Sequence, residues 1–351
     1  MTEVGTAHAI SPDSGTHWTE PGAWPAAPGV HRIPLPLPMD GLRAVNVYAI
    51  ETDDGLTLID GGWAIEVSRA LLESSLREIG REVRDIDRFL VTHVHRDHYT
   101  QAVTVRREVG SHVSLGLGDK ATLDLIRRRD RLEDDPHVAL LRAVGAPDIA
   151  RAWADFTRTN TPDLSLWDDP DTWLDGDLEL AVGARTIDAV HTPGHTQGHY
   201  VFADRPGGLL FAGDHVLPTI TPSIGFEPAL AELPLGDFMA SLTKVRGLPD
   251  LTLLPAHGPV APSSHARVDA LLAHHEVRLD LCVAAIGDGS HAAYDVAGSL
   301  PWTRHEHRLA DLDVFNTALA ILETRAHLEL LVARGVLVRG ETDGVEHYTA
   351  A

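Results

Sequence analysis

The chain has 351 residues, of which 44% are hydrophobic and 23% are charged, values that are ordinary for a globular protein with a sizeable core. Its formal net charge of −22 at pH 7 argues against a general affinity for nucleic acid or anionic membrane surfaces, because phosphate binding requires clustered basic side chains. No apolar run is long enough to span a membrane, no signal-peptide pattern opens the chain, and the single Cys282 excludes an internal disulfide. We therefore expect a cytoplasmic protein.

The N-terminal part predicts an arm followed by strands and a helix. Residues 1–29 are rich in Pro, Gly, Ser and Thr, which indicates a mobile arm. Apolar residues alternate with prolines over residues 33–38, a pattern typical of an edge strand. The runs 45–50 and 56–60 flank an Asp-Asp-Gly turn and predict a β-hairpin. Apolar periodicity then predicts a helix over residues 64–79.

Four side chains of metal-binding type crowd into six residues: His93, His95, Asp97 and His98. The residues just before them, 88–91, have the pattern of a short buried strand, so we expect the cluster at the end of that strand. In an extended segment the first three side chains would share one side, whereas the last would face another point. Two metal ions close together are the simplest use of such a divided set.

Residues 118 to about 175 differ from the rest of the chain in composition and in predicted secondary structure. They follow an expected helix at residues 101–110 and a short strand near 113–115, and they are mostly helical and charged. Four large aromatic side chains are scattered through them: Trp153, Phe156, Trp167 and Trp173. Two interpretations stay open, a packed helical insertion and a cap whose aromatic side chains line a substrate pocket.

The second half returns to short strands and turns. Four strands are expected, at residues 178–182, 186–190, 200–203 and 209–212. Three motifs lie among and after them, and each places a His or Asp beside Gly or Pro, where a tight turn can aim a ligand. The motifs are His-Thr-Pro-Gly-His-Thr-Gln-Gly-His at 191–199, Phe-Ala-Gly-Asp-His at 211–215 and Leu-Pro-Ala-His-Gly at 254–258.

Taken in order, the His cluster and these three motifs resemble the metallo-β-lactamase superfamily over about residues 30–262. The resemblance implies an α+β fold, an αββα sandwich of two mixed sheets face to face with helices outside, and two divalent metal ions. Seven residues match the family's ligands: His93, His95 and His195 for the first metal, Asp97, His98 and His257 for the second, and Asp214 as the bridge between them. Such a set of imidazoles and carboxylates favours zinc, and iron or manganese would also accept it.

At some positions the sequence departs from known branches of the superfamily, and these departures narrow the set of branches that it resembles. Asp214 stands where the superfamily's zinc β-lactamases have Cys, and His95 stands where the flavodiiron branch has Glu. The segment from Asp214 to His257 is too short for the inserted domain of the nuclease branch. The remaining pattern resembles glyoxalase-II-like hydrolases and hydrolases of the β-lactamase-like protein 2 type.

Residues 263–351 predict a small C-terminal domain. Three helices are expected, at residues 262–285, 292–300 and 315–334. A hairpin about Asp343-Gly344 follows, which completes the order of a winged helix, a domain that the β-lactamase-like protein 2 type carries. Residues 289–351 hold nine acidic and five basic side chains, so we expect packing against the catalytic domain or a homodimer rather than binding of nucleic acid.

Side chains near the motifs have further expected roles. Asp60 ends a strand beside a sharp turn and is either a turn residue or a support for the metal ligands. His191 and His199 are expected to pack or to support ligands, and so is His215, although it lies next to the bridging position. The loop 216–226 is mostly apolar, which indicates a hydrophobic substrate and suggests three candidates for substrate contact: His215, Ile220 and Phe226.

The predicted function is a binuclear metal-dependent hydrolase. Two metals would lower the pKa of a shared water, and the bridging hydroxide would attack the carbonyl of a small acyl substrate, a thioester, ester or lactone. Asp97 and Asp214 are the predicted catalytic residues, which orient the nucleophile and move a proton. Two alternatives stay open: an RNA phosphodiesterase (endoribonuclease) with the same two metals, and a persulfide dioxygenase with one iron. A binding module without catalysis is disfavoured because all seven ligand positions are filled.

Overall fold

A seven-stranded mixed sheet carries the first half of the chain in the computed structural model, which describes residues 17–38, 41–128, 135–160, 162–302 and 307–351. Its strands follow chain order: β1 (Trp24–Ala27), β2 (Val30–Pro36), β3 (Ala44–Glu51), β4 (Leu56–Ile59), β5 (Ile86–Leu90), β6 (His112–Gly116) and β7 (Thr172–Leu174). β1 to β4 pair antiparallel, as the predicted hairpin requires, and β4 to β7 pair parallel. Because parallel neighbours need crossovers, α1 (Glu66–Glu78) joins β4 to β5 and α2 (Arg96–Val109) joins β5 to β6.

A five-stranded sheet carries the second half. Its order is β12-β11-β10-β9-β8, with these bounds: β8 (Leu178–Val182), β9 (Arg185–His191), β10 (Tyr200–Asp204), β11 (Leu209–Gly213) and β12 (Thr252–Pro255). Only β11 and β12 pair parallel in this sheet, and α6 (Pro234–Arg246) makes the crossover between them. The four strands expected between residues 178 and 212 are all present.

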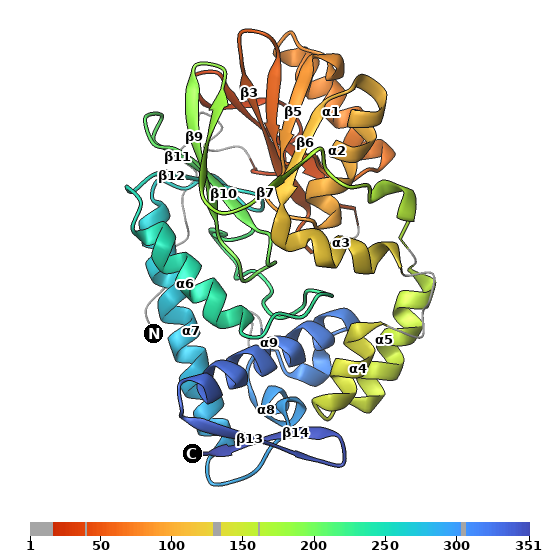
Figure 1. The fold of residues 1–351 in the computed structure, drawn as a ribbon, viewed down its shortest axis with the longest axis vertical. Helices are drawn as coiled ribbons and strands as arrows, with labels where there is room; N and C mark the ends of the chain where they lie inside the picture. The colour runs from red at the N-terminus through yellow and green to blue at the C-terminus, as the bar shows by residue number, and fades with distance from the viewer. Residues whose placement is uncertain (1–16, 39–40, 129–134, 161, 303–306) are drawn as a thin grey trace.

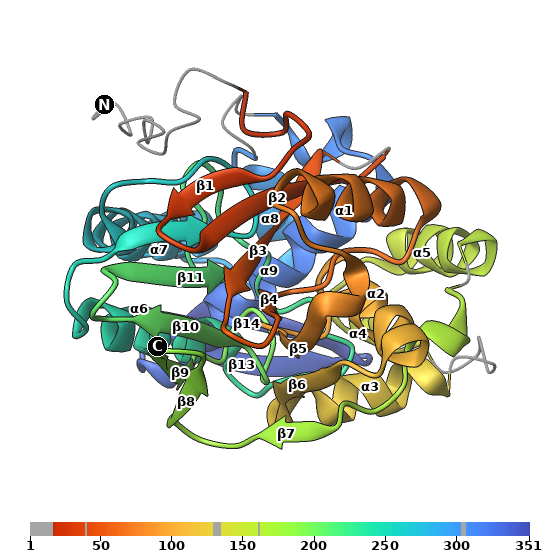
Figure 2. The ribbon, with the colours of Figure 1, turned by 90° about the horizontal axis from the view of Figure 1, so that it is seen from above.

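The two sheets face each other with helices on their outer sides, as Figure 2 shows. Between them lies one hydrophobic cluster with members from both sheets, in which the Tyr48 and Phe211 rings meet edge to face at 5.3 Å. A second cluster joins the other face of the first sheet to α1 and α2. Every residue of β3 except Glu51 is buried, as expected for a strand covered on both faces. The αββα sandwich predicted from the sequence is therefore confirmed.

The N-terminal predictions need correction. The arm expected over residues 1–29 does not extend that far, because Trp24–Ala27 forms β1 and pairs with β2; residues 1–16 lie outside the described part of the chain. The proline-containing strand is therefore internal rather than an edge strand. Its prolines are tolerated because β1 pairs only with Val30, His31 and Arg32, so Pro34 and Pro36 lie beyond that pairing.

The described residues of the inserted segment include the α-helices α3 (Lys120–Arg127), α4 (Pro136–Ala143) and α5 (Pro147–Thr159) before the chain returns to the first sheet as β7. α5 packs against the C-terminal helix α9 (Val314–Ala333). Trp153 is buried there, and its ring lies 5.3 Å from Phe226 and 6.0 Å from Phe315. This packing agrees with the interpretation as a packed helical insertion.

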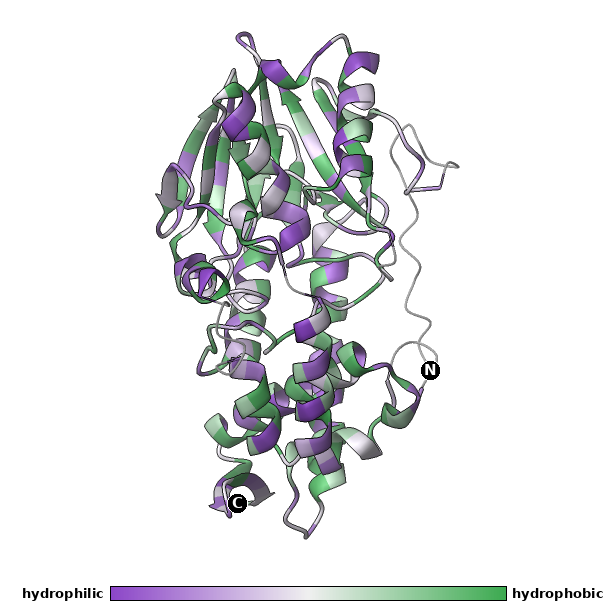
Figure 3. Cartoon of the chain, turned by 90° about the vertical axis from the view of Figure 1, so that its right-hand side faces the viewer, coloured by the Kyte–Doolittle hydropathy of each residue, from purple (hydrophilic) through white to green (hydrophobic). Residues whose placement is uncertain are grey.

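The C-terminal residues form a lobe around α9, together with α7 (Ser264–Ile286), α8 (Ala293–Ser299), β13 (Leu337–Thr342) and β14 (Val345–Ala350). Figure 1 shows this lobe below the sandwich, with α4 and α5 beside α9. Figure 3 shows hydrophobic residues running through both parts. One hydrophobic cluster includes side chains of α4, α5, β10, β11 and α9, so the lobe shares a core with the second sheet.

The predicted order of helices and hairpin is present in this lobe, while its classification as a winged helix stays a prediction. Among the described residues, no helix combines the length and the apolar character needed to cross a bilayer.

Candidate metal centre

The turn from β5 into α2 carries four of the predicted ligands. His93 lies in the loop, His95 is the residue that precedes the helix, and Asp97 and His98 lie in the first helical turn. The alternation of side chains from His93 to Asp97 predicts an extended segment, and this prediction is wrong beyond His95, where α2 begins. The helix is what separates Asp97 and His98 from the two earlier histidines, and its N-terminus favours the negative charge of Asp97.

The other three predicted ligands also follow strand ends. His195 lies in the loop between β9 and β10, Asp214 follows β11, and His257 follows β12. β11 and β12 are parallel neighbours, with Gly213 opposite Pro255, so their carboxyl ends deliver Asp214 and His257 to the same edge. This convergence depends on the pairing of strands whose sequences are far apart.

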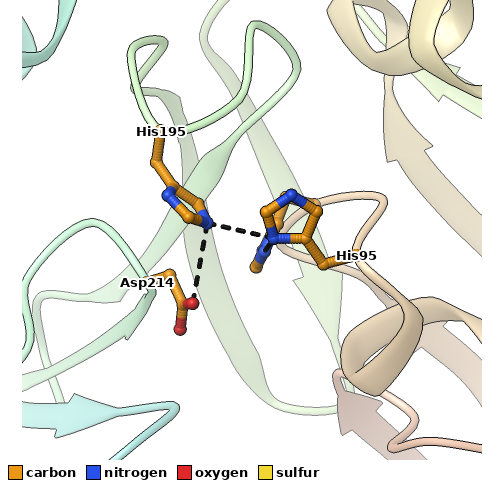
Figure 4. Close-up of side chains that lie close together, drawn as sticks. His95, His195 and Asp214 are labelled. Carbon is orange, nitrogen blue, oxygen red and sulfur yellow. Dashed lines mark hydrogen bonds and ion pairs between the residues drawn. The ribbon is translucent and has the colours of Figure 1, made fainter. Parts of the chain in front are cut away.

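The seven side chains form two groups, each with its ligand atoms within 4.8 Å of one another. The first ligand group is His93, His95, His195 and Asp214, and the second ligand group is Asp97, His98 and His257. In the first, Nδ1 of His95 lies 2.9 Å from Nε2 of His93 and 3.1 Å from Nε2 of His195. Figure 4 shows His95, His195 and Asp214 pointing toward one another.

Asp214 lies between the two groups and offers one oxygen to each. Its Oδ2 is 3.6 Å from Nε2 of His195 in the first group. Its Oδ1 is 3.3 Å from Nε2 of His257 and 3.7 Å from Nε2 of His98 in the second. Asp97 joins the second group through Oδ2, which lies 3.4 Å from Nε2 of His257. A carboxylate divided in this way has the geometry of a bridge between two ions.

Three atoms of the predicted ligands are buried without a hydrogen-bond partner: Nε2 of His98, Nε2 of His257 and Oδ1 of Asp214. Burying a polar atom without a partner is costly, and native proteins rarely do so without a compensating ligand. These three atoms converge on one point, and they are nitrogen and oxygen donors of the kind that zinc, iron and manganese bind. The residues therefore fit divalent metal ions.

The far side of three of the imidazoles, those of His195, His257 and His98, is held by an acceptor. Nδ1 of His195 donates to the Ser223 carbonyl, and Nδ1 of His257 donates to the Ala44 carbonyl, both at 2.7 Å. Because a carbonyl can only accept, the proton resides on Nδ1 and the lone pair of Nε2 faces the site. His98 is held similarly, with Nδ1 at 2.8 Å from Oδ2 of Asp60.

The sequence left open whether Asp60 is a turn residue or a support for the metal ligands. In the structure it is both. It adopts a positive φ of 62° at the turn after β4. Its Oδ1 also accepts from the backbone N–H of Thr92 at 2.7 Å, while Oδ2 orients His98. His199 supports the site similarly, since its Nε2 accepts from the backbone N–H of Asp214 at 3.2 Å.

Burial and neighbouring charges set the protonation states. Burial, with the neighbouring histidines, lowers the pKa of His93 well below its usual value and lowers the pKa of His95 to about 3. Burial would raise the pKa of Asp97, but His98 and His257 outweigh it and lower that pKa to about 2. Neutral imidazoles and ionised carboxylates are the forms that bind metals.

His98 differs from the other ligands in its electrostatic surroundings. Burial would lower its pKa, but the carboxylates of Asp60, Asp97 and Asp214 outweigh burial and raise the pKa to about 10. This part of the site therefore carries enough negative charge to hold a positive ion, whether a proton on the imidazole or a metal.

The three predicted substrate residues lie in different surroundings. His215 is fully buried, and its ring lies 5.0 Å from that of Phe238. Ile220 is 39% exposed. The Phe226 ring stacks on His137 at 4.5 Å and joins the aromatic cluster of α5 and α9. The ring contacts of His215 and Phe226 are to residues other than the seven ligands, and substrate contact stays a prediction for all three side chains.

Sequence reasoning missed the groups that hold the ligand loops together. The Ala44 and Ser223 carbonyls orient two ligands, but a backbone carbonyl leaves no signal in a sequence. Asp119 and Glu227 are buried acidic residues that bond to ligand-bearing loops. Neither lies in a motif, and an isolated acidic residue normally indicates only solvent exposure.

An αββα sandwich with a divided His and Asp centre at its strand ends defines a class of metal-binding enzymes. A family model described as the metallo-β-lactamase superfamily matches residues 40–257. The chain belongs to the metallo-β-lactamase superfamily, as its motifs indicated.

Individual proteins agree with this assignment. A β-lactamase domain protein from Burkholderia ambifaria has a TM-score of 0.81 and 27% identity, covering 97% of this chain and 98% of that one. The lactamase-like protein aptB of Emericella nidulans is 27% identical over 277 residues, which are 77% of this chain and 68% of that protein. The atrochrysone carboxyl ACP thioesterase AacuM of Aspergillus aculeatus is 32% identical over 146 residues, 41% of this chain and 43% of the thioesterase. That last match therefore covers less than half of either protein.

Proposed function

We propose that the chain is a binuclear metal-dependent hydrolase that cleaves an acyl bond, with thioesters as the preferred substrate class. The observation that carries the proposal is the division of Asp214, whose two oxygens lie near separate ligand groups. Superfamily membership and the thioesterase relative support hydrolysis of this kind. The thioester preference extends to this chain only as part of the proposal.

Two bound divalent ions would lower the pKa of a water molecule and polarise the substrate carbonyl. His93, His95 and His195 would hold one ion, Asp97, His98 and His257 the other, and Asp214 both. Asp97 keeps its negative charge at neutral pH because its pKa is lowered to about 2. The neighbouring His98 and His257 outweigh the effect of burial, which would raise that pKa. The Asp97 carboxylate can therefore accept a hydrogen bond from the attacking water and orient it. Asp214, which lies between the two groups, can do the same.

An apolar groove beside the ligand turn suits the acyl part of a substrate. Arg96 lies between His95 and Asp97 in the chain, and its guanidinium lies 4.4 Å from the centroid of the Trp63 ring. Trp63 in turn borders an open groove whose lining is mostly apolar: Pro38, Trp63, Ile65, Glu66, Val67 and Ala70. The contact between Trp63 and Arg96 connects this groove to the ligand turn, and we propose that the groove receives a hydrophobic acyl group.

The test is metal analysis combined with a substrate panel. We expect two divalent ions per purified chain and hydrolysis of at least one aryl or alkyl thioester, ester or lactone. Activity should disappear with a chelator and return with Zn²⁺. His257→Ala should lose activity, whereas His112→Ala, which replaces an exposed histidine whose ring bonds to Thr172 on β7, should keep it. A fully metallated protein that cleaves no acyl substrate of the panel would falsify the proposal.

The two alternative functions, RNA phosphodiesterase and persulfide dioxygenase, are tested in the same experiment by adding their substrates to the panel. Salt-dependent cleavage of single-stranded RNA that is lost in His257→Ala would establish the phosphodiesterase instead. One iron per chain with oxygen uptake on a persulfide would establish the dioxygenase. The net charge of −22 weighs against RNA, and the divided Asp214 weighs against a single metal. Zinc as the ion, a homodimer and a cytoplasmic location stay predictions.

A further inference from the structure

A buried acidic residue joins the loops of the first ligand group. Asp119 is fully buried between β6 and α3. One carboxylate oxygen accepts from the backbone N–H of Val94, and the other accepts from the backbone N–H of Gly198, both at 2.8 Å. Val94 lies between His93 and His95, and Gly198 lies three residues after His195. One side chain thus bonds to both segments that carry the three histidines.

The ordinary role of an acidic residue at this position does not explain Asp119. It directly precedes α3, where an Asp usually accepts from the first N–H groups of its own helix. Its side chain makes no such capping bond. Instead, both oxygens are directed at the ligand loops.

The backbone around Asp119 is built for close contact with the His195 loop. A Cβ added at Gly198 would lie 2.3 Å from the Asp119 nitrogen. A Cβ at Gly116 would lie 1.9 Å from the Gly198 oxygen, and one at Gly118 would lie 2.1 Å from the Gln197 oxygen. Three glycines therefore allow two backbones to touch where the carboxylate makes its bonds.

Glu227 braces the same loop from a second direction. It is 5% exposed, and its Oε2 accepts from the backbone N–H of Gln197 at 2.9 Å. Its Oε1 lies 2.7 Å from the hydroxyl of Thr122 on α3. Burial and the nearby Asp119 charge raise the pKa of Glu227 to about 8, which favours its neutral form at neutral pH.

We propose that Asp119 is a positioning residue of the first ligand group, which holds His93, His95 and His195 at their mutual distances, and that Glu227 is a secondary brace. The inference rests on the proposed metal centre. The two carboxyl groups differ in chemistry. Each oxygen of Asp119 faces a backbone N–H donor and must accept, and the Thr196 hydroxyl also favours the charged form of this carboxylate. Glu227 faces one N–H donor and one hydroxyl, and a hydroxyl can either donate or accept.

This difference predicts opposite outcomes for two isosteric substitutions. Asp119→Asn places an NH₂ group against a backbone N–H and releases one loop, so we expect metal affinity to fall by about 10–100-fold. Glu227→Gln can accept from Gln197 and donate to Thr122, so its affinity should stay within about twofold of the wild type. Asp124→Asn, on the helix α3 that follows Asp119 and paired with Lys120 and Arg127, is the matched control and should change nothing.

The measurement is a Co²⁺ titration of the metal-free chain, read by the visible absorption spectrum, with Zn²⁺ competition for affinity. Asp119→Asn should also change the band positions, because the nitrogen donors of the first group move. If Asp119→Asn melts at a lower temperature but binds Co²⁺ with wild-type affinity and spectrum, Asp119 is merely structural and the inference is overturned.

Two further outcomes are also decisive. If Asp119→Asn does not fold, Glu227→Ala removes only the secondary brace, and it should still weaken Co²⁺ binding and shift the spectrum; an unchanged titration overturns the inference. If the wild-type chain binds no Co²⁺ or Zn²⁺, the proposed metal centre itself is wrong. Failure of the metal centre is therefore distinguishable from failure of the positioning role.

Discussion

The two ligand groups are built from the same residue types but hold their atoms by different means. The first relies on neutral imidazoles, because burial and neighbouring histidines lower the pKa of His93 and His95. The second relies on negative charge, because Asp60, Asp97 and Asp214 surround His98. The comparison teaches that one edge of a sandwich can present a preformed set of nitrogen donors beside an acidic set. We expect ions in the two groups to respond differently to substitutions.

Removing the shared ligand should have the largest effect, because it damages both groups. We expect Asp214→Ala to reduce acyl hydrolysis by more than about 100-fold, beyond the usual cost of removing a supporting residue, and to weaken both ions. Metal analysis and turnover of the best thioester check this. Asp188→Ala, on β9 and paired with Arg205 at the surface, is the control. Wild-type metal content with full activity would remove Asp214 from the centre.

Removing a ligand that belongs to one group alone should release one ion and leave the other bound. His195→Ala should release the ion of the first group, and His257→Ala that of the second, so that each variant retains about one ion per chain. Each should lose most activity, since hydrolysis by this mechanism uses both ions. Metal stoichiometry after dialysis is the measurement, with exposed His112→Ala as control. Loss of both ions in both variants would show that the groups act as one unit.

Substituting a residue that orients a ligand should weaken metal binding in only one of the two ligand groups. Asp60→Asn keeps the shape of the side chain but removes the charge that faces Nδ1 of His98. We expect the second ion to bind about 10–100-fold more weakly and the first to change by less than about twofold. A two-site Co²⁺ titration checks this, with exposed Asp54→Asn as control. Equal weakening of both ions would contradict the difference between the groups.

The smallest effect concerns stability rather than metal binding. The pKa of Glu227 is raised to about 8 in the folded chain, chiefly by burial, so its contribution to stability is present below about pH 4.5 and is lost as the pH rises through about 8. Glu227→Gln cannot ionise, and its free energy of unfolding should decline less across that range, by on the order of 5 kcal/mol, since one pKa unit corresponds to about 1.4 kcal/mol. Urea unfolding of metal-free protein at several pH values measures this.

The control for this pH experiment is Glu232→Gln, an exposed glutamate in the same segment. Its pH profile should match that of the wild type. If Glu227→Gln also matches the wild type, then the pKa of Glu227 is the same in the folded and the unfolded chain, and burial does not raise that pKa.

The fold and the candidate ligands were largely predictable because their signals are local. The His cluster and the three later motifs each lie beside strand-like runs, and the structure places all seven predicted ligands at one edge. The helix start at Arg96 was missed because His93 to His98 alternate as a strand would, while the hydrogen bonds that begin α2 are invisible in that pattern. β1 was missed because its pairing partner β2, rather than its own sequence, makes it a strand.

Sequence alone determined which residues this protein offers for chemistry: an ordered set of His and Asp motifs, held at turns by Gly and Pro. Tertiary structure alone decided how they are divided and held. Asp214 lies between two groups because β11 and β12 end side by side, and His257 is oriented by the Ala44 carbonyl from the opposite sheet. Asp119 and Glu227 gained their places only because folding buried them against loops distant in sequence. The physical reason is that motifs record local geometry, whereas burial and long-range hydrogen bonds exist only after the sheets have packed.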